Sequence, residues 1–185
     1  MISIFTKRQT PKPESGALVE RELEILFRIA RQLTGNDSDA EDLVGQTLFQ
    51  ATRAWDRFDG QYPRSWLIKI LRNEHLGSVR ASQSRPTVSF EDSIEPVEAC
   101  FWQEIDWKIV GQDLDRIMRM LPEEFRLAVA LCDIEEITRE EAAIALSVPV
   151  GTVNSRLHRG RKLLRAKIVE HLGDLSASQL GVLQS

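Results

Sequence analysis

The chain has 185 residues, of which 28 are acidic and 24 are lysine or arginine, so its formal net charge is −4. This length is enough for one ordinary domain or two small ones. The acidic balance excludes a uniformly basic protein that coats DNA, so any contact with nucleic acid must come from a local basic patch.

The composition does not indicate membrane, metal or covalent chemistry. No apolar run approaches the ~18 residues of a membrane span, and the apolar patch at the N-terminus is too short for a signal sequence. Cys100 and Cys132 lie outside any C-x-x-C spacing, and three histidines do not complete a zinc-ligand pattern. We expect a cytoplasmic protein without membrane insertion, with no metal site, no cofactor and no catalytic residues.

After a disordered segment at 1–16, apolar periodicity predicts a helical module over 17–81. Its first helix, over 17–33, ends at Gly35-Asn36. The apolar face of this helix is predicted to consist of Val19, Leu23, Leu26, Ala30 and Leu33. A second helix, over 38–56, begins with a capping box of Ser38 and Glu41. Its apolar stripe, predicted to pack against the first helix, is Ala40, Leu43, Val44, Leu48, Ala51 and Trp55.

The outward face of the second helix carries an aromatic side chain among polar ones. Phe49 lies away from the apolar stripe and is surrounded by Asp42, Gln46 and Arg53. An exposed aromatic with a polar rim is typical of a partner surface. Single exposed apolar residues are common, so the pattern alone leaves a solvated face equally open.

A third helix is expected to begin at Pro63, a residue favoured in the first turn, and to run to Arg80. One sector of this helix carries Trp66, Lys69, Ile70, Asn73 and Arg80. An aromatic ring, an amide and cations together suit stacking on unpaired bases and hydrogen bonding to them. Taken alone, the segment slightly favours the simpler interpretation, in which Trp66 is a core residue and the cations are solvated.

Residues 82–98 are interpreted as a linker, because prolines and serines interrupt any helical period. A second module is predicted over 99–171, with one helix over 97–121 and another that starts at Pro122. The segment 172–185 is expected to be a fraying tail. The predicted fold class is all-α, with two small helical domains joined by a flexible linker.

The last two predicted helices form a helix-turn-helix. Thr138 and Glu141 make a capping box at the start of a short helix that runs to Leu146. A turn containing Pro149 follows, since proline cannot extend that helix. The predicted buried stripe of the second helix is Val150, Val153, Leu157, Leu164 and Ile168. The opposite face carries Ser155, His158, Arg159 and Lys162, with Arg165 near its edge.

This second helix is strongly cationic. From residue 151 to 171 its basic residues are Arg156, Arg159, Arg161, Lys162, Arg165 and Lys167, against the single acid Glu170. A local excess of this kind is what phosphate binding requires. A solvated amphipathic helix would show the same charge run, but the capped short helix and the proline turn favour a DNA-reading helix-turn-helix.

Two stretches resemble conserved regions of bacterial RNA polymerase sigma factors. The second region is matched by DAEDLVGQTLFQATRAWDRFDG followed by RSWLIKILRNEHL, and the fourth by LPEEFRLAVALCDIEEITREEAAIALSVPVGTVNSRLHRGRKLL. The pattern is similar to the small extracytoplasmic-function (ECF) group, which keeps only those two regions joined by a linker. The resemblance covers Leu18 to Ile168.

The resemblance implies a protein that binds core RNA polymerase, recognises promoter DNA and opens its strands without bond chemistry of its own. The residues implied to dock on the clamp coiled coil of the largest polymerase subunit are Asp39, Glu41, Asp42, Gln46 and Phe49. Those implied to melt the downstream promoter element and capture an unpaired base are Trp66, Lys69, Arg72 and Asn73. Those implied to read the upstream element in the major groove are Asn154, Ser155, Arg156, His158, Arg159, Arg161 and Lys162.

Within the upstream reader, we expect Arg159 to bind a guanine edge and Arg161 a phosphate. The resemblance also implies a contact with the polymerase flap, and an inhibitory anti-sigma protein that covers both binding faces. The chain departs from the family at Gly45-Gln46, where Gln-Glu is usual, and a mid-helix glycine costs roughly 1 kcal/mol relative to alanine. His158 occupies a position that varies in the family, so no promoter sequence is implied.

Two other classes of function stay open. A stand-alone transcription regulator would use the same helix-turn-helix on palindromic duplex DNA without polymerase, and half-site symmetry would reveal it. An enzyme would use carboxylates such as Glu41, Asp42, Glu140 and Glu141. Carboxylates at helix starts are better explained by capping and the helix dipole, and no nucleophile or glycine-rich phosphate loop accompanies them.

Overall fold

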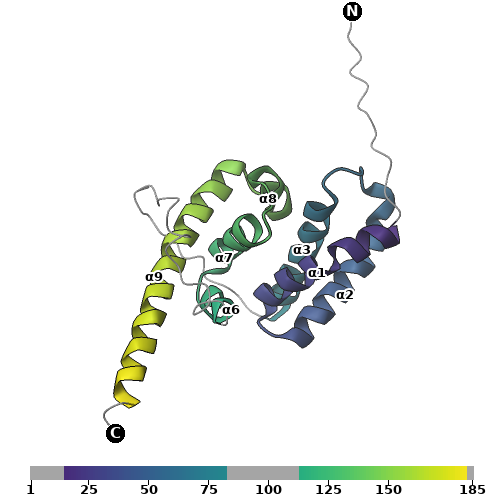
Figure 1. Cartoon of the computed structure of the whole chain (residues 1–185). Helices are drawn as coiled ribbons and strands as arrows, with labels where there is room; N and C mark the ends of the chain where they lie inside the picture. The colour runs from purple at the N-terminus through teal and green to yellow at the C-terminus, as the bar shows by residue number, and fades with distance from the viewer. Residues whose placement is uncertain (1–14, 83–112, 183–185) are drawn as a thin grey trace, which may run out of the picture. The chain divides into compact units, whose positions relative to one another are not determined.

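Helices and short helical turns make up the regular structure of the described part of the chain. The computed structural model describes residues 15–82 and 113–182. They belong to two compact units (Figure 1), one with the helices between Ser15 and Ser82 and the other with most of those from Leu114 onward. The all-α prediction with two helical modules is confirmed. Nearly all of the predicted N-terminal segment 1–16 and linker 82–98, and the first part of the predicted helix 97–121, lie outside the described residues.

The first unit packs three helices, α1 (Ser15–Thr34), α2 (Asp37–Ala54) and α3 (Pro63–Ser82), with a 3-10 turn, η1 (Trp55–Arg57), after α2. The end of α1 is the one predicted, because Gly35 adopts a φ of 86° and its N–H donates to the Arg31 carbonyl at 2.9 Å. A left-handed residue at this position satisfies a carbonyl that the helix end would leave unpaired. Glycine adopts this conformation without the strain that a Cβ would bring.

The start of α2 uses a different cap from the one predicted. The Asn36 side chain accepts from the Asp39 N–H at 2.8 Å, and its Nδ2 donates to the Asp39 carboxylate at 2.7 Å. Asn36 is extended, with φ −144° and ψ 162°, which is the N-cap conformation. The predicted capping box of Ser38 and Glu41 is therefore wrong. The chain leaves α1 at the left-handed Gly35, so α2 already begins at Asp37 and Asn36 is its N-cap.

The buried face of α1 differs from the prediction at one position, where Glu22 is buried in place of Leu23. Leu23, predicted to be buried, is 42% exposed, whereas Glu22 is only 2% exposed. Glu22 is buried because Nε of Arg64, in α3, donates to its carboxylate at 2.6 Å. Burying a carboxylate is tolerated when it is paired and hydrogen-bonded. The face of α1 that packs inward is thus centred on Glu22 and on Leu18, Leu26, Ile29 and Leu33.

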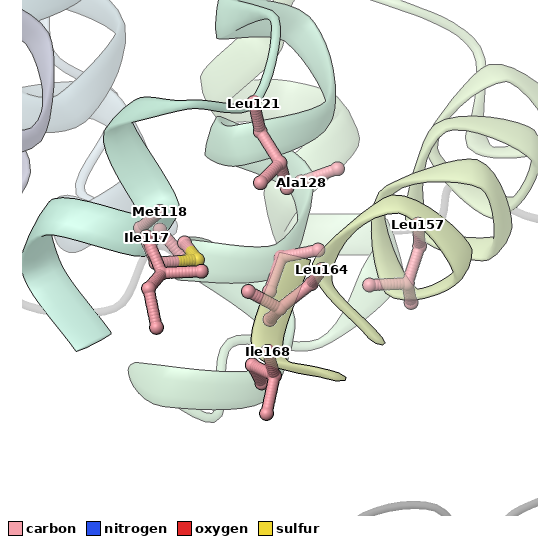
Figure 2. Close-up of a cluster of buried hydrophobic side chains, with 9 residues drawn as sticks. Ile117, Met118, Leu121, Ala128, Leu157, Leu164 and Ile168 are labelled. Atoms are coloured by element: carbon pink, nitrogen blue, oxygen red, sulfur yellow. The ribbon is translucent and has the colours of Figure 1, made fainter. Parts of the chain in front are cut away.

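The second unit has a core shared by α6 (Leu114–Arg119), α7 (Glu123–Val129), the π-helical turn η2 (Ala130–Ile134) and α9 (Val150–Val182). Figure 2 shows the side chains that converge there, which include Ile117, Met118, Leu121, Ala128, Leu157, Leu164 and Ile168. Four members of the predicted stripe on the second helix of the helix-turn-helix are confirmed as buried, namely Val153, Leu157, Leu164 and Ile168. Packing of this stripe fixes which side of α9 faces away from the core.

The first helix of the pair, α8 (Arg139–Leu146), carries the predicted capping box. The Glu141 N–H donates to Thr138 Oγ1 at 3.2 Å, and the Thr138 N–H donates to the Glu141 carboxylate at 3.2 Å. Both residues satisfy donors that a helix start leaves without partners. Local sequence alone therefore defines where α8 begins.

The turn between α8 and α9 is a Schellman motif. The Val148 N–H donates to the Ala143 carbonyl at 3.1 Å, and the Ser147 N–H donates to the Ile144 carbonyl at 3.2 Å. Ser147 takes the left-handed position with a φ of 54°. Two residues beyond it, the Pro149 carbonyl accepts from the first turn of α9, so the chain reverses within a few residues.

The last helix is longer than predicted. α9 continues without a break to Val182, so most of the segment 172–185, expected to be a fraying tail, is helical. Leu172 packs against the core of the second unit, and this contact extends the buried stripe by one turn beyond Ile168. The start of the extension is therefore held by burial.

Candidate nucleic-acid interface

The cationic face of α9 lies opposite its buried stripe. The members of the predicted reader that are exposed or half-buried and lie on this face or at its edges are Asn154, Ser155, His158, Arg159 and Lys162. Ser155 is bonded locally, since its Oγ donates to the Thr152 carbonyl at 3.0 Å. Within the described residues, Arg159 and Lys162 have no carboxylate partner. Their charges are therefore not neutralised by this unit.

Two other members of the predicted reader are held by carboxylates of the same unit. Arg161 donates to both carboxylate oxygens of Asp133, in η2, from Nε at 3.0 Å and from Nη2 at 2.6 Å. Nη2 of Arg156 lies 2.9 Å from Oε2 of Glu124, in α7. Both guanidinium groups are thus engaged inside the protein in this structure.

Helical geometry accounts for the position of Arg161. It follows Leu157 by four residues and precedes Leu164 by three, so at about 100° per residue it lies near the buried stripe. The side-chain hydrogen bond to Asp133 raises the pKa of Arg161. Spacing from the predicted stripe could have shown that Arg161 lies near the core. It could not have identified Asp133, which is 28 residues away in the sequence.

Trp66 of α3 belongs to a cluster of three aromatic rings. Its ring stacks on Phe58 with a centroid separation of 4.5 Å and meets Trp55 edge-on at 5.9 Å. The Trp66 side chain is half-buried, so the simpler interpretation of it as a packed residue accounts for much of its surface. The remaining predicted contacts of this helix, which are exposed or half-buried, are Lys69, Arg72 and Asn73.

The outward face of α2 is exposed as predicted. Phe49 has 56% of its surface exposed, and the guanidinium carbon of Arg53 lies 5.6 Å from the centre of its ring. The other exposed members of the predicted polymerase contact are Asp39, Glu41, Asp42 and Gln46. Asp39 also serves in the cap of α2. Gly45 lies on the same helix, and a Cβ there would meet nothing within 4 Å.

The described residues were also compared with what a metal site, a membrane span or a reactive thiol requires. No group of three or more histidine, cysteine, aspartate or glutamate side chains in the described ranges is arranged to hold a metal ion. No helix of those ranges is long and apolar enough to cross a membrane. Burial, and then the charge of Asp133, raise the pKa of the Cys132 thiol.

Comparison with known proteins gives two family matches in the order of the two units. "Sigma-70 region 2" matches residues 18–85, and "Sigma-70, region 4" matches residues 111–164. The ECF RNA polymerase sigma factor SigE of Mycolicibacterium smegmatis is 34% identical over 177 residues, which cover 94% of this chain and 68% of that protein.

Two solved structures are similar in fold and sequence. The sigma factor RpoE of Bartonella quintana, in complex with the anti-sigma factor NepR, matches with a TM-score of 0.64 and 28% identity, over 83% of this chain and 95% of that one. CnrH, in complex with the cytosolic domain of CnrY, matches with a TM-score of 0.60 and 25% identity, over 82% of this chain and 85% of that one.

Proposed function

The chain belongs to the ECF group of RNA polymerase sigma factors, and from this membership we propose how its two units act in transcription initiation. Sigma factors act with RNA polymerase and are non-enzymatic initiation factors. The presence of both sigma regions in order carries this assignment. A stand-alone regulator would need only the helix-turn-helix, so that alternative is not favoured.

The second unit is proposed to read the upstream promoter element with α9 in the major groove. The outward cationic face supports this, because the buried stripe from Val153 to Ile168 holds α9 against the core with that face outward. Arg159 is proposed to bind a guanine edge, since a guanidinium donates two parallel hydrogen bonds to O6 and N7. Lys162 is proposed to contact a phosphate. The same face supplies Asn154, Ser155 and His158.

Selection of duplex DNA from a random library tests this reader. The library would be challenged with holoenzyme assembled from core RNA polymerase and the full chain. Arg159→Ala should relax the preference at one base pair, because one bidentate contact discriminates by about 1–3 kcal/mol. Lys167→Ala is the matched control: it removes a cation of the same helix that is paired with Glu170 at 2.7 Å. Equal selectivity of the two variants would remove Arg159 from the reader.

The first unit is proposed to bind the clamp coiled coil of the polymerase through the outward face of α2. Asp42, Gln46 and Phe49 lie within one sector of this helix, so they form a polar surface with an aromatic centre. Exposed aromatics of this kind supply a large share of binding energy at interfaces. Asp39 and Glu41 lie on the sides of this sector.

Binding of the full chain to core polymerase measures this contact. Phe49→Ala should weaken the complex by about 1–2 kcal/mol, or roughly 5- to 30-fold in Kd. The matched control is Leu23→Ala, which truncates an exposed apolar side chain on α1 with 42% of its surface accessible. If both variants bind core polymerase as tightly as the wild type, the α2 face is not the docking surface.

Strand capture is proposed for α3, with Lys69 and Arg72 near the backbone and Asn73 on a base edge. Trp66 is proposed to act as one wall of a stacking platform that Phe58 supports from behind, since the two rings are already stacked. Base–aromatic stacking is worth about 1–3 kcal/mol per base. On DNA with a preformed single-stranded bubble, Asn73→Ala and Trp66→Ala should lose less open-complex formation than on duplex DNA, because the bubble removes the melting step.

An inhibitory protein partner is also proposed. Two similar proteins were solved with protein partners, the sigma factor RpoE with the anti-sigma factor NepR and CnrH with the cytosolic domain of CnrY. We propose that an anti-sigma protein covers the binding faces of this chain in the cytoplasm. Such a protein should compete with core polymerase for the chain, and simultaneous binding of both would contradict the proposal.

A further inference from the structure

We propose that Asp133 is a positioning residue for promoter reading, because it holds Arg161 of α9 inside the protein and so sets the rotation of the helix that reads DNA. Arg161 then makes no phosphate contact. This inference rests on the proposed function of α9 as the upstream reader. It changes the role that the family resemblance gives to Arg161, and it assigns a role to a residue outside the reader.

The geometry of the pair suits positioning. Two donors of one guanidinium meet two oxygens of one carboxylate, at 3.0 and 2.6 Å. A bidentate pair fixes direction as well as distance, since both groups are planar. The Arg161 side chain is 28% exposed and that of Asp133 is 11% exposed. Solvent therefore screens this pair less than a pair on the open surface.

Apolar packing decides which side of α9 is buried, and the Arg161–Asp133 pair adds a directional constraint on the rotation of the helix. Leu157, Leu164 and Ile168 fill the core, but contacts between methyl groups are not directional. Arg161 adds direction because it lies beside this stripe. Arg159, two residues earlier, lies about 200° around the helix from Arg161. Fixing Arg161 against Asp133 therefore turns Arg159 outward.

A second pair holds the other flank of the same helix. Arg156 and Glu124 are 2.9 Å apart, and Arg156 lies about 140° around α9 from Arg161. The two carboxylates belong to consecutive elements, α7 and η2, that pack beneath α9. The reading helix is thus paired on both sides of its buried stripe with carboxylates of one continuous segment. The Asp133 pair is the stronger constraint, because two hydrogen bonds define it.

Salt dependence separates a positioning residue from a phosphate contact. Each phosphate contact adds about 0.9 to the slope of log affinity against log salt concentration. Loss of a phosphate contact therefore lowers the slope and weakens all sequences alike. Loss of a positioning residue leaves the slope unchanged and lowers the ratio between the preferred sequence and a scrambled one.

The experiment measures binding of holoenzyme, assembled with the full chain, to an upstream duplex selected by the wild type and to its scrambled version. Asp133→Asn and Arg161→Gln should each lower discrimination by about tenfold, the scale of one good bidentate base contact, without changing the salt slope. Lys162→Gln is the comparison for a phosphate contact, and should lower the slope by about 0.9 with discrimination intact. The charge-swapped variant Asp133→Arg/Arg161→Asp should regain part of the discrimination.

The direction in which Asp133→Asn changes DNA binding decides between a positioning role and a phosphate contact for Arg161. If Arg161 contacted a phosphate, freeing it from Asp133 would leave binding unchanged or strengthen it, and Arg161→Gln would lower the slope. Either result overturns the proposal, as does a folded charge-swapped variant that discriminates no better than the single variants. Amide hydrogen exchange in α7 and α9 shows whether each variant is folded. If the wild-type holoenzyme selects no upstream sequence at all, the proposed function itself fails, which is a separate outcome.

Discussion

Gly160 lies where α9 meets α7 at a separation that leaves no room for a side chain. A Cβ at this position would come within 2.7 Å of Val129 Cγ2 and 2.9 Å of the Phe125 carbonyl oxygen. The ordinary contact distance is about 3.5–4.0 Å, so α7 and α9 would have to move apart by roughly 1 Å. One obstacle is backbone, so a change of rotamer does not relieve the clash. Gly160→Ala is therefore predicted to destabilise the second unit.

The change in the free energy of unfolding caused by Gly160→Ala is the sum of two opposed contributions. Overpacking a close contact costs typically about 1–3 kcal/mol, whereas replacing a mid-helix glycine by alanine gains about 1 kcal/mol in helix propensity. The net prediction is a loss of up to about 2 kcal/mol, which corresponds to as much as 30-fold faster exchange of amides that open with this unit. Gly45→Ala in α2 is the matched control, since a Cβ there meets nothing within 4 Å. It should gain up to about 1 kcal/mol.

Hydrogen exchange of the full-length protein is the appropriate assay, because it reports the two units separately. Gly160→Ala should accelerate exchange in α7 and α9 and leave α1 to α3 unchanged. Gly45→Ala should slow exchange in α2 or leave it unchanged. If Gly160→Ala slows exchange in α9, the close approach of the two helices is not what excludes a side chain there.

Three further predictions concern buried or half-buried groups. Arg64→Ala leaves the buried Glu22 carboxylate without its 2.6 Å partner. Breaking a fully buried ion pair costs about 3–5 kcal/mol, and this variant should destabilise the first unit by less, since Arg64 is partly exposed. Unchanged hydrogen exchange in α1 and α3 would contradict this. Leu157→Ala should lower the free energy of unfolding of the second unit by about 2–5 kcal/mol and accelerate exchange in α9. The comparison is Leu163→Ala, which truncates an exposed leucine of the same helix. A smaller effect of Leu157→Ala than of Leu163→Ala would show that Leu157 is not part of the core. Because burial raises the pKa of Cys132, its thiolate forms only at higher pH. In a Cys100→Ser variant, iodoacetamide should alkylate it more slowly at pH 8 than it alkylates a cysteine in an unstructured peptide.

Sequence patterns predict the helices well where the signal is local. The cap of Thr138 and Glu141 and the end of α1 at Gly35 depend on residues within one turn of each other, and both are confirmed. Four of the five residues predicted for the buried stripe of α9 are confirmed as buried, and Val150 is half-buried, because apolar periodicity over many residues leaves one face to bury. The cap of α2 was wrong by two residues, since Ser38 and Asn36 both fit the cap preference and only the turn before Asn36 decides between them.

Pairings between distant residues could not be predicted from periodicity. Hydropathy favours Leu23 over Glu22 as a core residue, and the close pair of Glu22 with Arg64, 42 residues away in the sequence, reverses that order. Asp133 in the same way decides the position of Arg161. The outward face of α2 needed no such partner, so Phe49 was predicted to be exposed and is exposed. Periodicity and local motifs thus predict helix faces and the cap of α8, but not the cap of α2 or the charges that are buried against each other.

Transcription from promoter-bearing DNA by purified core RNA polymerase, with and without the full chain, tests whether the chain directs initiation as a sigma factor. We expect transcripts with defined start sites that need the protein, and fewer of them with Arg159→Ala. A preformed bubble at the start site should restore part of the activity of Asn73→Ala but not that of Phe49→Ala. If core polymerase neither binds the chain nor initiates with it, while the isolated chain still binds duplex DNA, the chain does not act as a sigma factor with that polymerase.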